Sequence, residues 1–185
     1  MKKRCKAYVG ARNTGKTTKL YQYYLQMYQN KRNIMVVDSA TEHEDKSLIV
    51  RLKKERKDAI WIPSCEVKAI CYPDISDTMY PKMNITQETM LYLCDVSFFL
   101  EKGYDYPPGA TREYYRNLYK RLSMQLVVAL LDRVDSILFD EIECIAQSRL
   151  VLEHIAEKNK TLLMTLHSLD SIQDMQDIID VERVF

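Results

Sequence analysis

The chain has 185 residues and a net charge of +1, with 46% hydrophobic and 29% charged residues, which suits one folded domain with an ordinary core. It contains no apolar run near the ~20 residues of a membrane helix, and only a short apolar stretch follows the basic N-terminus, so we expect a cytoplasmic protein without membrane insertion. The five cysteines are odd in number and widely spaced, which indicates free thiols and disfavours a zinc site.

The first third of the chain alternates apolar runs with amphipathic segments. Three short apolar runs predict buried strands, at 5–9, 33–39 and 59–63. Between them, apolar residues recur at helical spacing and predict helices over 15–31 and 46–58. The first of these helices has no breaker after Gly15, so it begins directly at a glycine-containing loop.

The middle of the chain is less regular. Residues 64–83 contain Pro73 and Pro81 and predict no regular element. Asn84 can cap a helix over 84–103, a turn follows at 104–110, and a long helix is predicted over 111–133. We therefore expect residues 64–110 to form a mainly helical insertion.

The last third returns to the alternating pattern. Strands are predicted at 134–141, 160–168 and 181–185, with helices between them at 144–159 and 170–180. Strands that alternate with helices are typical of a parallel sheet covered on both faces. The sequence thus predicts one three-layer α/β domain over 1–185, with a mostly parallel sheet and the insertion within it.

The most specific motif is GARNTGKT at residues 10–17, which matches G-x-x-x-x-G-K-[ST] between a predicted strand and helix. Loop amides and the helix N-terminus can hold the phosphates of a nucleoside triphosphate. Lys16 would contact the β- and γ-phosphates, and the Thr17 hydroxyl would bind Mg²⁺. The predicted nucleotide-binding residues are Gly10, Ala11, Arg12, Asn13, Thr14, Gly15, Lys16, Thr17 and Thr18.

A second motif, SILFDE at residues 136–141, ends a predicted strand with two acids. Asp140 is placed to hold Mg²⁺ through water, and Glu141 to polarise an attacking water as general base. An ordinary strand end followed by acids at a helix start would look the same in isolation. The glycine loop earlier in the chain favours the catalytic interpretation.

A third polar strand end is LLMTLHS at residues 162–168. Thr165 and His167 can contact the γ-phosphate or the attacking water there, and His167 can do so while neutral. The alternative for His167 is a surface histidine in a turn. We favour a site role because three strand ends should converge on one crevice.

Together these motifs resemble those of P-loop ATPases of the branch with a catalytic glutamate and an additional strand, such as ABC-type, secretion and DNA-translocating ATPases. The resemblance covers residues 5–58 and 122–185, and it implies ATP and Mg²⁺ as ligands and ATP hydrolysis as the activity. It also implies that the strand before His167 lies between the strands that precede the glycine loop and Glu141.

The sequence departs from individual families within that branch. The segment RNLYKRLSMQLVVALL before the acidic strand lacks the glycines of the LSGGQ-like stretch of ABC ATPases. DNA-pumping ATPases usually carry Gln where His167 stands. Kinases of this fold usually lack the Asp-Glu pair and carry an arginine-rich lid, which is not evident here.

We therefore predict a motor or regulatory ATPase subunit whose site is completed by a second copy or a protein partner. The alternatives are a DNA-translocating or packaging ATPase of a phage or mobile element, a small-molecule phosphotransferase, and a non-hydrolysing nucleotide-dependent interaction module. The choice between ATP and GTP stays open. The candidate arginine fingers are Arg112, Arg116, Arg133 and Arg149.

Charge is unevenly distributed along the chain. Residues 1–60 hold 15 basic and 6 acidic side chains, whereas residues 131–185 hold 5 and 12. The basic run RLKKERK at 51–57 is typical of a solvated helix face, with nucleic-acid contact as the alternative. Asp38, Glu42 and His43 lie at the end of a predicted strand, on the same side of the sheet as the nucleotide. We expect a solvated loop there, with contact to substrate or metal as the alternative.

Overall fold

The computed structural model describes residues 4–38, 47–62, 90–96, 130–140 and 149–185. The strands in chain order are β1 (Cys5–Val9), β2 (Ile34–Asp38), β3 (Ile60–Ile62), β4 (Leu91–Asp95), β5 (Ser136–Phe139), β6 (Thr161–Leu166) and β7 (Ile179–Arg183). The helices are α1 (Lys16–Gln29), α2 (Leu48–Glu55), α6 (Arg149–Glu157) and the 3₁₀ helix η4 (Asp170–Met175).

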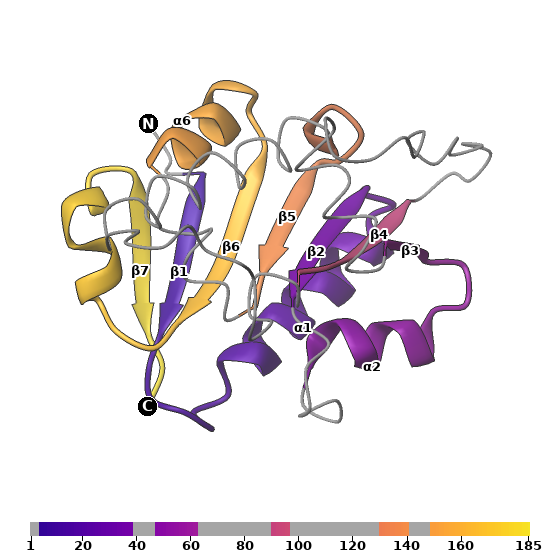
Figure 1. Ribbon diagram of the computed structural model, residues 1–185, viewed down its shortest axis with the longest axis horizontal. Helices are drawn as coiled ribbons and strands as arrows, with labels where there is room; N and C mark the ends of the chain where they lie inside the picture. The colour runs from indigo at the N-terminus through magenta and orange to yellow at the C-terminus, as the bar shows by residue number, and fades with distance from the viewer. Residues whose placement is uncertain (1–3, 39–46, 63–89, 97–129, 141–148) are drawn as a thin grey trace, which may run out of the picture.

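The strands form one seven-stranded sheet in the order β3-β4-β2-β5-β6-β1-β7, and every neighbouring pair is parallel. The arrowheads of β1, β5, β6 and β7 accordingly point to the same edge of the sheet (Figure 1). This confirms the α/β fold with a parallel sheet. Strand β6 lies between β5 and β1, which is the position that the family resemblance implies for the strand before His167.

Apolar side chains cover both faces of this sheet. On one face, Leu20 and Tyr24 of α1 pack with Leu48 and Leu52 of α2 in a buried cluster. On the other face, α6 and η4 pack over a second and larger cluster. Successive residues of the central strands alternate between the two clusters, as the pleat requires. The result is the three-layer arrangement predicted from the alternation of strands and helices.

The helix predicted over 84–103 is wrong at residues 91–95, which form β4 between β3 and β2. All five residues of β4 are buried, and Leu91 and Leu93 face one core cluster while Tyr92 and Cys94 face the other. A strand buried on both faces shows no polar alternation, so periodicity alone cannot distinguish it from a buried helix.

Strand β4 lies within residues 64–110, the range that we predicted as a mainly helical insertion. Its five residues are part of the central sheet instead. The rest of that range, apart from 90–96, lies outside the described residues, as does most of the helix predicted over 111–133. The division of the chain into one domain with an insertion therefore stays a prediction.

The other elements fall within their predicted ranges, with a change near the end of the chain. The helix predicted over 170–180 is the shorter 3₁₀ helix η4, and β7 already begins at Ile179. A non-helical Ile172 interrupts η4, and its side chain is fully buried against the sheet.

Candidate active site

The glycine loop connects β1 to α1 at the carboxyl edge of the sheet. Its two positions require glycine for different structural reasons. A Cβ on Gly10 would overlap the carbonyl oxygen of Val184 and approach the Thr14 hydroxyl to 2.8 Å. Gly15 caps α1 with φ of 89°, in the left-handed region that side chains with a Cβ avoid. The motif's glycines are thus required by close backbone approach and by helix capping.

Lys16 is the first residue of α1 and is only 4% exposed. Its ammonium nitrogen donates hydrogen bonds to the carbonyls of Gly10 at 2.9 Å and Ala11 at 2.7 Å, so the side chain lies back over the loop. The first turn of α1 carries no acidic residue. A buried cation and the positive end of a helix dipole therefore act together at this loop, a combination that favours anions.

The Thr17 hydroxyl donates a hydrogen bond to Oδ1 of Asp140 at 3.1 Å, across 123 residues of sequence. Asp140 follows β5 directly and is only 3% exposed. The same Oδ1 accepts a second hydrogen bond from the hydroxyl of Thr165 at 2.7 Å. The structure thus brings the predicted metal-binding pair together and adds Thr165, for which the sequence predicts contact with the γ-phosphate or water.

Three neighbouring strands carry buried aspartates at their carboxyl ends. Asp95 ends β4, Asp38 ends β2 in register with it, and Asp140 follows β5. Asp38 is not in the solvated loop that we expected, since it is 6% exposed and its Oδ2 accepts hydrogen bonds from Ser47 Oγ and Ile49 N. It therefore caps the start of α2, whereas Asp140 faces the glycine loop through Thr17.

Sequence reasoning missed Asp95 because it placed that residue in a helix. The signal that could have found it is an aspartate at the end of the short apolar run 90–94, the same pattern that precedes Asp38 and Asp140. Glu42 and His43 lie outside the described residues.

The predicted catalytic residues differ in how far the structure describes them. His167 follows β6 directly and is partly buried. The carbonyl of Leu166, one residue earlier, accepts the backbone N–H of Gly10 at 3.2 Å, so His167 begins beside the start of the glycine loop. Glu141 lies outside the described residues, and its role stays a prediction.

Most of the other loop residues are exposed, in contrast to the buried Lys16. Ala11, Arg12, Asn13 and Thr18 are exposed, and Thr14 donates a hydrogen bond to the Ala11 carbonyl at 3.0 Å. Asn13 has a positive φ of 64°, a conformation that asparagine tolerates better than most residues. The loop is therefore held in part by a hydrogen bond of its own, from Thr14 to Ala11.

Strand β7 supports the loop from the outer side. The backbone N–H of Val184 donates to the carbonyl of Val9 at 2.8 Å, and the C-terminal end of the chain lies at the same edge as the end of β1 (Figure 1). Glu182 of β7 forms ion pairs with Lys6 of β1 at 2.6 Å and with Lys19 of α1 at 3.2 Å. The hydrogen bond from Lys6 lowers the pKa of Glu182, so this carboxylate stays ionised at neutral pH.

Two arginines of the basic run at 51–57 contact α1. The Arg51 and Arg56 guanidinium groups each lie 3.5 Å from a ring centroid, over Tyr21 and Tyr28 respectively. Arg56 also donates to the Tyr24 hydroxyl at 2.8 Å. These two arginines contact the helix that begins at the glycine loop, while Arg51 and the lysines of the run are exposed, as expected for a solvated helix face.

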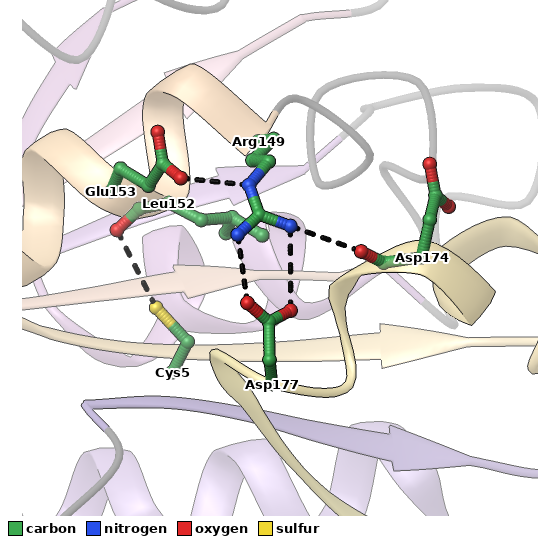
Figure 2. Close-up of polar contacts among 6 residues, drawn as sticks. All are labelled: Cys5, Arg149, Leu152, Glu153, Asp174 and Asp177. Carbon is green, nitrogen blue, oxygen red and sulfur yellow. Dashed lines mark hydrogen bonds and ion pairs between the residues drawn. The ribbon is translucent and has the colours of Figure 1, made fainter. Parts of the chain in front are cut away.

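Among the candidate arginine fingers, Arg149 is held within the chain. It begins α6 and makes a two-pronged ion pair with Asp177, a hydrogen bond to Glu153 at 2.7 Å and another to the Asp174 carbonyl at 3.1 Å (Figure 2). The hydrogen bond to Asp177 raises the pKa of Arg149 above the ordinary arginine value. Arg133 is described as well, whereas the other two candidates lie outside the described residues.

The same close-up shows how α6 contacts β1 through a cysteine (Figure 2). Cys5 is buried, its Sγ lies 3.9 Å from the carbonyl oxygen of Leu152, and burial raises the pKa of the thiol to about 12. Within the described ranges Cys5 and Cys94 are both free thiols, in agreement with the prediction for them. A thiol so far from ionisation is a packing group rather than a nucleophile.

The described residues contain no group of three or more His, Cys, Asp or Glu side chains placed to hold a metal ion. The Thr17 hydroxyl and the Asp140 carboxylate are nevertheless oxygen donors, the type that Mg²⁺ prefers. Mg²⁺ commonly uses one or two carboxylates together with phosphate oxygens, so this pair suits a metal that arrives with a nucleotide. No helix among the described segments is long and apolar enough to cross a bilayer.

Comparison with known proteins gives a distant structural likeness. No protein-family model matches the chain, and no curated protein matches it in sequence. Among solved structures, it is similar to the genome-packaging NTPase B204 from Sulfolobus turreted icosahedral virus 2 in complex with AMP, with 9% identity and a TM-score of 0.42. The likeness covers 92% of this chain and 69% of that one, and at this level it assigns no role to any residue.

Proposed function

We propose that this chain binds ATP with Mg²⁺ at the glycine loop and hydrolyses it to ADP and phosphate. The observation that carries the proposal is the hydrogen bond between Thr17 and Asp140, at 3.1 Å. It joins the first helical turn after the loop to the end of β5, two segments that the sequence marks independently for nucleotide chemistry. We assign to the protein the role of a motor or regulatory ATPase subunit.

Phosphate binding would use charges already directed at the loop. The Lys16 ammonium donates to the carbonyls of Gly10 and Ala11, and a phosphate oxygen is a stronger acceptor than either carbonyl because it is charged. The backbone amides at the N-terminus of α1 add further donors without an acidic side chain to compete. These groups would stabilise the negative charge that develops on the transferring phosphoryl group.

Metal binding would use Thr17 and Asp140 together with phosphate oxygens. Mg²⁺ bound there would neutralise charge on the β- and γ-phosphates. The Thr17 oxygen has lone pairs for the metal while its proton is donated to Asp140, so the hydrogen bond is compatible with metal coordination. Asp140 would supply the negative charge, through water as the sequence predicts, and its low exposure strengthens the attraction between this charge and the metal.

Hydrolysis requires that a water oxygen attack the γ-phosphorus while the bond from that phosphorus to the bridging oxygen of ADP breaks. We assign Glu141 to accept the proton of the attacking water, since it follows Asp140 directly in the sequence. We also assign His167 to hydrogen-bond the γ-phosphate or that water, and the support for this is that the carbonyl of Leu166, the residue before it, accepts the N–H of Gly10. A second copy or a protein partner would supply any missing positive charge.

The decisive experiment measures phosphate release and nucleotide binding by the purified chain with Mg²⁺, for the wild type and for Glu141→Gln. We expect ATP binding in both proteins and strongly reduced phosphate release in the variant, because the amide cannot accept the proton. Wild-type protein that binds neither ATP nor GTP at millimolar concentration would refute the proposal. Comparison of the two nucleotides also decides base preference.

Measurements on the wild type and on Glu141→Gln also separate the alternative functions from one another. Full activity of Glu141→Gln toward a small-molecule acceptor would favour a phosphotransferase, because the acceptor then replaces water. Tight ATP binding by the wild type without phosphate release, in the presence of partners, would favour a nucleotide-dependent interaction module. Stimulation of phosphate release by DNA at low salt would favour a translocating or packaging ATPase, for which the basic N-terminal third is the supporting feature.

A further inference from the structure

Thr165 is a buried hydroxyl residue near the carboxyl end of a mostly apolar strand. It lies on β6, is fully buried, and has apolar neighbours, Met164 and Leu166, on both sides along the chain. A buried hydroxyl costs free energy unless it is hydrogen-bonded, and a valine of the same shape would suit a buried strand at least as well. Its bond to Asp140 is therefore the feature that distinguishes threonine from valine at this position.

Strand register explains how Thr165 meets Asp140. Phe139 of β5 pairs with Met164 of β6, so the next residues along the two strands, Asp140 and Thr165, are cross-strand neighbours. Leu163, two residues before Thr165, belongs to the core cluster beneath α1. Thr165 therefore lies on the sheet face that α1 covers, the side from which Thr17 approaches.

The two hydroxyls that reach Asp140 differ in kind. Both donate to Oδ1, but Thr165 does so at 2.7 Å from the interior of a strand, whereas Thr17 does so at 3.1 Å from the first turn of a helix. A short bond from a rigid element to a charged oxygen restrains rotation of the carboxylate more than a longer one. Thr17 also has a second task, because its oxygen is the proposed metal ligand.

We propose that Thr165 is a positioning residue, whose hydroxyl holds the Asp140 carboxylate in the orientation that binds Mg²⁺ with the nucleotide. This inference rests on the function proposed above and assigns to Thr165 a role in metal affinity. Residues that orient metal ligands typically change metal affinity by about 10- to 100-fold when they are removed. In the proposed function Lys16 and the loop amides would hold the phosphates without Thr165, so we expect nucleotide binding in the absence of Mg²⁺ to be independent of it.

The test is a Mg²⁺ titration of nucleotide binding, followed with a fluorescent ATP analogue and repeated in EDTA. Thr165→Val removes the hydroxyl at nearly constant shape, and we expect the Mg²⁺ concentration for half-maximal enhancement of binding to rise at least about 10-fold. Binding in EDTA should be unchanged. Thr165→Ser keeps the hydroxyl and should restore the wild-type Mg²⁺ dependence to within about twofold.

A matched control is available on the same strand. Thr161→Val makes the same substitution at the amino end of β6, away from the glycine loop, and should leave the Mg²⁺ dependence unchanged. Circular dichroism establishes that each variant is folded. If Thr165→Val does not fold, Thr165→Ala is compared with Thr165→Ser under the same criteria.

The outcomes separate this inference from the proposed function. A wild type whose nucleotide binding ignores Mg²⁺ would remove the basis of both. If the wild type depends on Mg²⁺ and Thr165→Val shows the same dependence, the positioning role is wrong while the proposed function stands. An equal loss of binding with and without Mg²⁺ would also overturn it, because that result indicates a general structural role.

Discussion

Asp38 and Asp140 occupy equivalent places on neighbouring strands but are held by different groups. Both lie at the carboxyl end of a buried strand, and they are 6% and 3% exposed. Asp38 accepts its hydrogen bonds from Ser47 and from the backbone of Ile49, at the start of the helix that follows its own strand. Asp140 accepts its bonds from Thr17 and Thr165, on a distant helix and on the next strand.

Burial and strand position are therefore the same for the proposed metal ligand Asp140 and for Asp38, and only their hydrogen-bond partners distinguish them. The partners of Asp38 come from a local connection, so its negative charge stabilises one helix start. The partners of Asp140 come from across the sheet, and one of them belongs to the glycine loop and its helix. The predicted consequence is that Asp38 contributes to stability, whereas Asp140 contributes to chemistry.

The largest expected effect is on turnover in Asp140→Asn. Asparagine can still accept both hydroxyl protons, but it lacks the charge that would hold Mg²⁺. Loss of several kcal/mol of metal-assisted stabilisation corresponds to a fall in ATP hydrolysis of at least about 100-fold. Asp38→Asn, assayed alongside, should stay near the wild-type rate per folded molecule, and equal losses in the two variants would remove the distinction between them.

The second prediction concerns stability, where we expect the larger effect at Asp38. Asp38→Ala removes two acceptor interactions and leaves the Ile49 N–H buried, so we expect it to lower the free energy of unfolding by about 2 kcal/mol. Urea denaturation measures this value. Asp132→Ala is the control, because Asp132 is 78% exposed and its ion pair with Lys158 lies on the surface. A loss no larger than that of the control would show that the cap does not stabilise α2.

A smaller effect is expected from the hydroxyl donors themselves. Ser47→Ala removes one of the two hydrogen bonds to Asp38 and should cost about 1 kcal/mol of stability, with nucleotide binding unchanged. Thr17→Val removes the matching donor to Asp140 and should instead weaken Mg²⁺-dependent ATP binding. Thermal unfolding and nucleotide titration of both variants test whether Ser47 affects stability and Thr17 affects nucleotide binding, as expected for the carboxylates that they contact.

The smallest effect on stability is expected at the exposed ion pair of Arg149 and Asp177. It shows how little an exposed carboxylate contributes in comparison with the buried Asp38. Arg149→Ala should lower the Tm slightly, because the ion pairs to Glu153 and Asp177 are solvated. The difference from the wild type should shrink at high salt, since added ions screen exposed pairs. A large loss of ATP hydrolysis with an unchanged Tm would indicate instead that Arg149 acts as an arginine finger.

Much of the fold could be predicted because its signals are local. Short apolar runs flanked by polar turns form strands, and the loop glycines mark the start of α1 in the sequence itself. Strand β4 could not be recognised in the same way. Its residues are apolar toward both faces, and only its place between β3 and β2 shows that they pair as a strand.

The candidate site likewise has features that the sequence predicts and features that depend on how the strands pair. Motif spacing identifies Lys16, Thr17 and Asp140, and the structure brings the last two into contact. The pairing of Thr165 with Asp140 is not evident from spacing, because it depends on the register between β5 and β6. The function of Asp38 likewise depends on where α2 begins relative to β2.

The sequence by itself determined most of the strands, the shape of the glycine loop and the chemical types at three strand ends. Backbone preference and apolar burial act over a few residues, so a short stretch of sequence is enough to encode them. The fold was needed to show that Thr165 donates to Asp140 and that Asp38 caps α2. A carboxylate's role depends on the groups that donate to it, and here those groups come from 123 residues away in sequence for Thr17 and from a neighbouring strand for Thr165.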